Sequence, residues 1–242
     1  FLPFPKQVEM VEFCFKRDDR IKMVLARRGI GKTELVAIAG VLWHLYNHPT
    51  DTIAIISSTQ SLSRAILQSI SAYMLSSGLF NVKMAKADTI KLVENKFSKE
   101  PSVSAKSLKT ILRAIHPTFV LFDDPLTMET ADSKVMRALA FKKYEEAIDL
   151  TKNVIIIGQP SHEEDLYQLL RNKPLDQVDK KEVWNDDLPE MKVDLNKMRQ
   201  MGKSERNIQA NYEGNLILDE DYPFAQFKPV EFVGFRPSIL FI

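Results

Sequence analysis

The residues best suited to chemistry form a Gly-Lys-Thr tripeptide, Gly31 to Thr33, within the stretch ARRGIGKTEL. A short apolar run, residues 21–26, leads into it, and a largely apolar helical pattern follows. Backbone N–H groups at a helix N-terminus favour a phosphate. Lys32 would then reach the β- and γ-phosphates, and the Thr33 hydroxyl would ligate Mg²⁺. The tripeptide alone is weak evidence, because it occurs by chance in about one chain of this length in ten.

The entrance to this loop is unusual. The common P-loop pattern opens with a glycine, and here that position is Ala26. Gly29 and Gly31 supply the backbone freedom that Ala26 lacks. The loop residues expected to contact a nucleotide are Arg27, Arg28, Gly29, Ile30, Gly31, Lys32, Thr33 and Glu34.

A pair of carboxylates follows another apolar run, in FVLFDDP (residues 119–125). A buried strand that delivers two acids at its carboxyl end is the Walker B arrangement, in which Asp123 would hold Mg²⁺ and Asp124 would orient the attacking water. For this segment alone, an ordinary acidic turn is the better explanation. The two motifs lie about 90 residues apart, each at a carboxyl end where open α/β sheets bind ligands. Together they predict a nucleotide site.

A third apolar run, NVIIIGQP, ends in Gln159. In P-loop ATPases of the additional-strand class, a strand between the P-loop and Walker B strands carries a polar sensor of the γ-phosphate. GQP by itself is an ordinary turn, and its place after the Walker B segment is what favours the sensor role.

Helical and strand patterns alternate over the first two thirds of the chain. The expected helices cover residues 5–15, 34–46, 61–75, 133–150 and 162–172. The expected strands cover residues 21–26, 51–59, 118–125 and 153–160. Strands that are apolar throughout, separated by helices, indicate a mostly parallel sheet covered on both faces. We therefore expect an α/β P-loop NTPase fold of the additional-strand, RecA-like type.

The character of the chain changes after Pro160. We assign residues 1–160 to an ATPase core and the more polar residues 161–225 to a small lid or linker subdomain. The apolar ending SILFI reads like a strand cut within a domain, so we expect residues 226–242 to begin a connection to a domain beyond this chain.

Composition limits the other possibilities. The 242 residues carry a formal net charge of +1, so any nucleic-acid-binding surface must be local. The single cysteine, Cys14, excludes an intrachain disulfide and a multi-cysteine zinc site, and it suits a reducing compartment. No apolar run approaches the roughly 20 residues of a membrane span.

A local excess of positive charge lies between residues 81 and 116, where eight Lys or Arg face three acids. Such side chains supply contacts to DNA phosphates that do not depend on sequence. A solvated loop surface explains any one lysine equally well. The candidate DNA contacts are Lys83, Lys86, Lys96, Lys99, Lys106 and Lys109.

These segments, in this order, resemble the ATPase domain of tailed-bacteriophage large terminases, the motors that pump DNA into procapsids. The resemblance runs from PFPKQ through ARRGIGKT, IISST and FVLFDDP to GQP, and an arginine-rich loop without an opening glycine is typical of that family. It implies that Gln7 contacts adenine, that Arg28 lies over the phosphates and that Gln159 couples γ-phosphate state to movement. It also implies that Arg113 acts on the ATP of a neighbouring subunit. The chain departs from the family pattern at Asp124, where many members have Glu, and at Gln159, where Thr or Ser is commoner.

The resemblance further implies Mg²⁺-dependent ATP hydrolysis coupled to translocation of double-stranded DNA. The implied partners are the portal protein of the procapsid, the small terminase subunit and further copies of this chain in a ring, a pentamer, with a monomer in isolation. The implied location is the host cytoplasm, docked on the procapsid, and the full-length protein would also carry a nuclease domain. Two alternatives stay open: a helicase-like or other nucleic-acid-dependent P-loop ATPase, and a nucleotide-gated assembly module with little turnover.

Overall fold

The computed structural model describes residues 3–96, 98–112, 115–174 and 176–216. Within these residues, one mixed sheet holds eight strands in the order β3-β4-β5-β2-β6-β7-β1-β8. The strands are β1 (Ile21–Ala26), β2 (Ile53–Ser57), β3 (Val82–Ala85), β4 (Thr89–Leu92), β5 (Val103–Ser107), β6 (Phe119–Asp123), β7 (Val154–Gly158) and β8 (Val178–Val183). All neighbouring pairs from β5 to β8 are parallel, and β4 runs antiparallel to both β3 and β5. The expectation of a mostly parallel sheet is confirmed.

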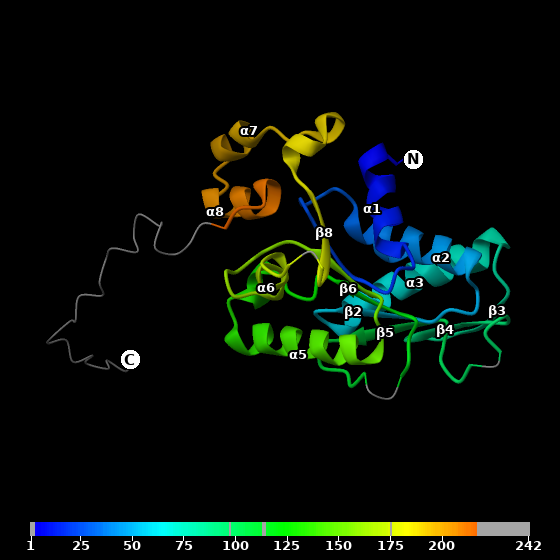
Figure 1. The fold of residues 1–242 in the computed structure, drawn as a ribbon. Coiled ribbons are helices and arrows are strands. Elements are labelled where there is room, and N and C mark those ends of the chain that lie inside the picture. Colours follow the sequence, from blue (N-terminus) through cyan, green and yellow to red (C-terminus); the bar gives the residue numbers. More distant parts are fainter. Residues whose placement is uncertain (1–2, 97, 113–114, 175, 217–242) are drawn as a thin grey trace, which may run out of the picture.

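Helices cover both faces of this sheet (Figure 1). On one face lie α1 (Pro5–Phe15), η1 (Thr33–Gly40), α2 (Val41–Asn47) and α3 (Gln60–Ser77). On the other lie α5 (Lys134–Leu150) and α6 (Leu166–Arg171), with the short α4 (Met128–Ala131) before them. Strand side chains alternate between the two cores, so that Ile155 and Ile157 pack with the first group of helices and Ile156 with the second. Both faces of the central strands are therefore buried, which is why those strands read as unbroken apolar runs.

The helix after the P-loop differs in detail from the expectation. The sequence predicts one α-helix over residues 34–46, and the structure winds its first half, η1, as a π-helix before it continues as α2. Such π segments are rare and are found frequently at functional sites.

The region after Pro160 contributes a strand to the sheet. β8 pairs in parallel with β1, so residues 178–183 belong to the sheet and not to a separate subdomain. The division at residue 160 is wrong for this strand, because β8 is polar at its middle positions and gives no apolar signal. The elements that follow β8, to which we give the name lid, are η2 (Asn185–Asp187), η3 (Pro189–Met191), α7 (Leu195–Gln200), α8 (Glu205–Ile208) and η4 (Gln209–Glu213). The predicted connection at residues 226–242 lies outside the described residues.

None of the helices in the described part of the chain has the length and apolar character needed to cross a membrane.

Candidate nucleotide-binding site

The P-loop leaves the carboxyl end of β1 and turns into η1. Gly29 and Gly31 have φ of 80° and 84°, a region that strains any residue with a Cβ. Residues 32 and 33 then enter the helix. The two glycines thus supply the freedom expected of them, and the loop forms without a glycine at Ala26.

Lys32 is folded back onto its own loop. Its buried ammonium donates to the carbonyl oxygens of Ala26, at 2.9 Å, and Arg27, at 3.4 Å. Burial lowers the pKa of Lys32, and the charges of Asp124 and Asp123 oppose that shift. A phosphate would be a stronger, charged acceptor for this ammonium than the two carbonyls.

Thr33 and Asp123 meet across the site. The Thr33 hydroxyl donates to the two carboxylate oxygens of Asp123, at 3.0 and 3.3 Å, and this contact joins the first helical residue to the end of β6. Burial raises the pKa of Asp123 to about 7, and the neighbouring charge of Asp124 adds to the rise. A buried carboxylate with so little positive charge around it is suited to binding a cation, and a bound cation would lower its pKa again.

The oxygen pair of Thr33 and Asp123 fits Mg²⁺. This ion favours oxygen ligands, and in phosphate-transfer sites it is held by one or two protein groups together with phosphates and water. The described residues contain no group of three or more His, Cys, Asp or Glu side chains able to hold a metal ion on their own.

Asp124 has the left-handed backbone conformation, with φ of 41°. Its N–H donates to the carbonyl of Ile157, at 3.1 Å, which continues the β6–β7 pairing by one residue. Burial raises the pKa of Asp124, while the charges of Lys32 and Arg28 lower it. The strained backbone turns Asp124 into the lining of the cavity described below, whereas Asp123 faces Thr33.

Gln159 follows β7, which lies between β6, the strand that ends in Asp123, and β1, the strand that leads into the loop. This is the strand order that the additional-strand class requires. The Gln159 side chain lines the cavity, and its Nε2 is buried without a hydrogen-bond partner among the described residues. A buried amide donor without an acceptor is costly, so it fits a site whose acceptor is a ligand oxygen.

These groups surround a cavity of about 610 Å³ at the carboxyl edge of the sheet. Its lining comes from three parts of the chain: the P-loop, the segments after β6 and β7, and the lid. The lining residues are Arg28, Gly29, Gly31, Lys32, Thr33, Glu34, Asp124, Leu126, Thr127, Met128, Glu129, Gln159, Ser161, Asn207 and Asn211.

Three predicted nucleotide contacts, Gln7, Arg27 and Ile30, are buried behind the loop and do not line the cavity. The Gln7 amide donates to the Ile30 carbonyl, at 2.8 Å, and accepts from Phe4 N–H, at 2.8 Å. Gln7 therefore braces the P-loop, and its contact with adenine stays a prediction.

The two loop arginines differ. The buried Arg27 guanidinium donates to the carbonyls of Met191 in the lid, at 2.6 Å, and of Arg28, at 2.9 Å. The Arg28 side chain is exposed and lines the cavity, and its backbone N–H donates to the Asn211 carbonyl, at 2.8 Å. Arg28 thus faces the cavity, whereas Arg27 connects the loop to the lid.

Sequence reasoning missed the lid side of the cavity. Asn207 and Asn211 belong to α8 and η4, and Asn211 Nδ2 donates to the Asn207 carbonyl, at 2.8 Å. Asn211 and Gln209 lie in a π-helical segment that ends before Gly214. The only signal in the sequence is a polar run, NIQANYEGN, which by itself predicts no partner.

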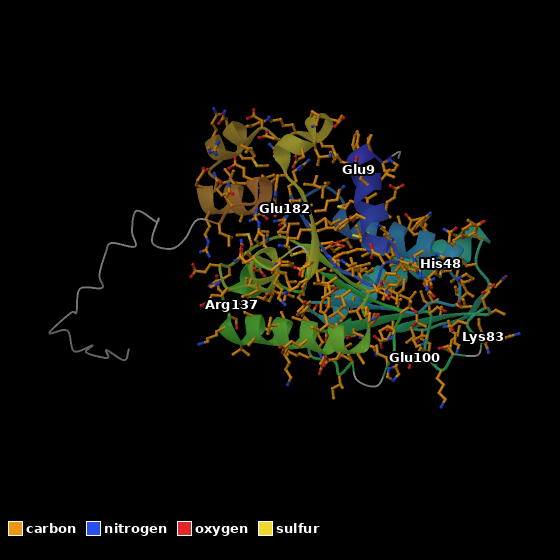
Figure 2. The ribbon with its side chains drawn as sticks, viewed as in Figure 1. Glu9, His48, Lys83, Glu100, Arg137 and Glu182 are labelled. Atoms are coloured by element: carbon orange, nitrogen blue, oxygen red, sulfur yellow. The ribbon has the colours of Figure 1, made fainter. Side chains whose placement is uncertain are left out.

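The six candidate DNA lysines do not form one row. Lys86 stands in the β3–β4 turn, and Lys106 and Lys109 lie at the end of β5 and in the turn after it, so these three are near the carboxyl edge that holds the cavity. Lys96 and Lys99 lie between β4 and β5, at the opposite edge. Figure 2 shows the sixth, Lys83, on the outermost strand β3. Arg113 lies outside the described residues, so its role in a neighbouring subunit stays a prediction.

Comparison with known proteins gives no match to a family model and none to a curated protein. Solved structures do match. A mutant of the Thermus phage P74-26 large terminase ATPase domain has a TM-score of 0.62 at 14% identity, over 90% of this chain and 95% of that chain. The large terminase of a second, thermophilic bacteriophage gives 0.60 at 16% identity, over 90% of this chain and 54% of that one. The same thermophilic-phage protein in complex with ATP-γ-S gives 0.57 at 15% identity, over 88% and 53%.

This chain spans about half the length of the thermophilic-phage protein. At these identities the likeness establishes architecture, and the strand order and P-loop geometry agree with it. The chain has the P-loop NTPase fold of phage large-terminase ATPase domains.

Proposed function

We propose that this chain is the ATP-hydrolysing motor domain of a phage large terminase, which drives double-stranded DNA into a procapsid. The observation that carries the proposal is the Thr33–Asp123 contact of 3.0 Å beside a cavity of about 610 Å³ that Lys32, Asp124 and Gln159 line together. The thermophilic-phage large terminase, which shares the fold, has been solved with ADP and with ATP-γ-S, which supports adenine nucleotides as ligands here.

The chain's own residues divide the work of hydrolysis. Lys32 leaves the Ala26 carbonyl for the β- and γ-phosphate oxygens and stabilises the charge that develops on them. Thr33 and Asp123 would hold Mg²⁺, which when bound would neutralise phosphate charge. Asp124 orients the attacking water and accepts its proton, and the free amide of Gln159 donates to a γ-phosphate oxygen.

The lid is the part of the chain that moves during the hydrolysis cycle. The P-loop is tied directly to the lid by two hydrogen bonds, from Arg27 to Met191 and from Arg28 to Asn211. A change in the loop on phosphate release therefore moves the lid. We further propose duplex DNA as the track, a ring of identical subunits, a pentamer, in which Arg113 serves the next subunit, and docking on the portal of a procapsid in the host cytoplasm with the small terminase subunit.

The test is ATP hydrolysis by this chain, measured alone, with duplex DNA, and with DNA and a portal ring. We expect turnover that duplex DNA stimulates and that Lys32→Ala abolishes, with the exposed Lys152→Ala as the matched control that leaves it unchanged. ATP binding without turnover under all three conditions would favour the assembly module. Separation of DNA strands would favour the helicase-like motor.

A further inference from the structure

A tyrosine of α6 reaches the end of β7, the strand that leads into Gln159. Tyr167 is fully buried, and its hydroxyl fills the space where a Cβ on Gly158 would stand, 2.2 Å from that position. Gly158 has no positive φ, so its requirement for glycine comes from this close approach. The tyrosine hydroxyl is therefore held directly behind the catalytic edge of β7.

Among the described residues, the Tyr167 hydroxyl has no acceptor for its proton. Burial raises the pKa of Tyr167 well above its ordinary value, and the charges of Asp124 and Asp165 add to the rise, whereas the backbone N–H of Leu126 opposes it. The group is thus a neutral donor at physiological pH. A phenylalanine would fill the same space without the cost of a buried, unpaired hydroxyl.

The matching acceptor lies at the same strand end. The backbone N–H of Asp124 donates to the carbonyl of Ile157, the residue before Gly158, so the Asp124 backbone and the Tyr167 hydroxyl both lie at the end of β7. The charge of Asp124 acts on Tyr167. In the described part of the chain no group donates a hydrogen bond to the Asp124 carboxylate. Among the described residues, the Tyr167 hydroxyl is therefore a donor without an acceptor, and the Asp124 carboxylate is an acceptor without a donor.

We infer that Tyr167 is a positioning residue that donates its hydroxyl to the Asp124 carboxylate in the hydrolysis-competent arrangement of the site. This inference rests on the proposed function, because it assigns Asp124 to the attacking water. The hydrogen bond holds one carboxylate oxygen and directs the other to that water. It also connects α6 to the catalytic carboxylate.

The first test compares two tyrosines that carry the same change. Tyr144, on α5, is also buried with an unpartnered hydroxyl, and burial alone raises its pKa. We expect Tyr167→Phe to lower kcat about tenfold or more with KM for ATP unchanged, and Tyr144→Phe to leave both unchanged. Thermal unfolding should be the same for both variants. In an Asp124→Asn background, Tyr167→Phe should cost nothing more, because its target is gone.

Equal kcat for the two phenylalanine variants would overturn the inference, as would a Tyr167→Phe variant that loses nucleotide binding and thermal stability together, since that marks a packing role. A crystal structure with ATP-γ-S and Mg²⁺ gives a readout that does not need turnover. The hydroxyl should lie within hydrogen-bond distance of the Asp124 carboxylate, and a hydroxyl bonded elsewhere refutes the inference. Absence of turnover in the unaltered chain, by contrast, counts against the proposed function.

Discussion

The two ends of the sheet are built differently. β1, β6 and β7 are buried along nearly their whole length, and each leads into residues of the candidate site. At the other end, β3 and β4 are short strands in which half-buried positions alternate with exposed or buried ones, and lysines stand on their surface. The site residues are therefore held in place by buried strands, whereas the lysines stand on short, partly exposed strands. We expect single changes to have large effects at the first end and small, cumulative effects at the second.

After Lys32→Ala, the largest effect is expected from Asp124→Asn. An amide can contact water but is a poor proton acceptor, so hydrolysis should fall at least about a hundredfold while nucleotide binding is retained. The exposed Asp149→Asn on α5 is the control, with unchanged turnover. Rates and ATP affinity measured together decide the matter. A parallel loss of binding would make Asp124 a structural residue or a metal ligand.

Next is Gly158→Ala. The new methyl group would overlap the Tyr167 side chain, so we expect unfolding free energy to fall by about 1–3 kcal/mol in urea denaturation. Because the two residues share one space, combining Gly158→Ala with Tyr167→Leu should cost less than the sum of the single changes. If the two losses of unfolding free energy simply add, the methyl group introduced at position 158 does not clash with the Tyr167 hydroxyl, and the explanation is wrong.

A smaller effect concerns Asp123 in the nucleotide-free protein. Its pKa is raised from 3.8 to about 7, so the folded state favours the protonated form, and this contribution to stability is lost as pH rises through about 7. Asp123→Asn removes the buried charge, and we expect it to stabilise the protein by about 1–2 kcal/mol at pH 8 and by less at pH 5. Urea midpoints at the two pH values measure this. A variant less stable than the unaltered protein at pH 8 would contradict the assignment.

The same contrast explains what could be predicted from the sequence. β1, β2, β6 and β7 were predictable because both their faces are buried, and so were the roles of Gly29 and Gly31, whose positive φ is a local property of the loop. β3, β4, β5 and β8 were not predicted. β8 carries Asp179, Lys180 and Lys181 at its half-buried middle positions, so only its pairing with β1 makes it a strand.

Within the site, the sequence predicted the contact between two local motifs but not the other contacts between residues far apart in the chain. The pairing of Thr33 with Asp123 was expected from two separate motifs, and the structure brings them together. The inward turn of Arg27 depends on Met191, which lies far away in sequence, and the bracing of the loop by Gln7 depends on a tertiary contact with Ile30. No pattern in one sequence contains that information.

The smallest effects are expected at the basic end of the sheet, where the structure sharpens one prediction. Lys109 and Lys99 are both exposed, but Lys109 follows the carboxyl end of β5 and Lys99 precedes its amino end. A motor that moves DNA with nucleotide state should hold its track near the nucleotide edge, which favours Lys109 together with Lys106.

Each lysine that contacts a phosphate contributes about 0.9 to the slope of log affinity against log salt. We therefore expect Lys109→Ala to flatten that slope by about one unit, Lys106→Ala with Lys109→Ala by about two, and Lys99→Ala not at all. Duplex DNA titrations at several salt concentrations measure all three. Equal flattening of the slope by Lys99→Ala would mean that DNA spans both edges of the sheet. An unchanged slope in every variant would indicate that these lysines form an ordinary solvated surface and do not contact DNA.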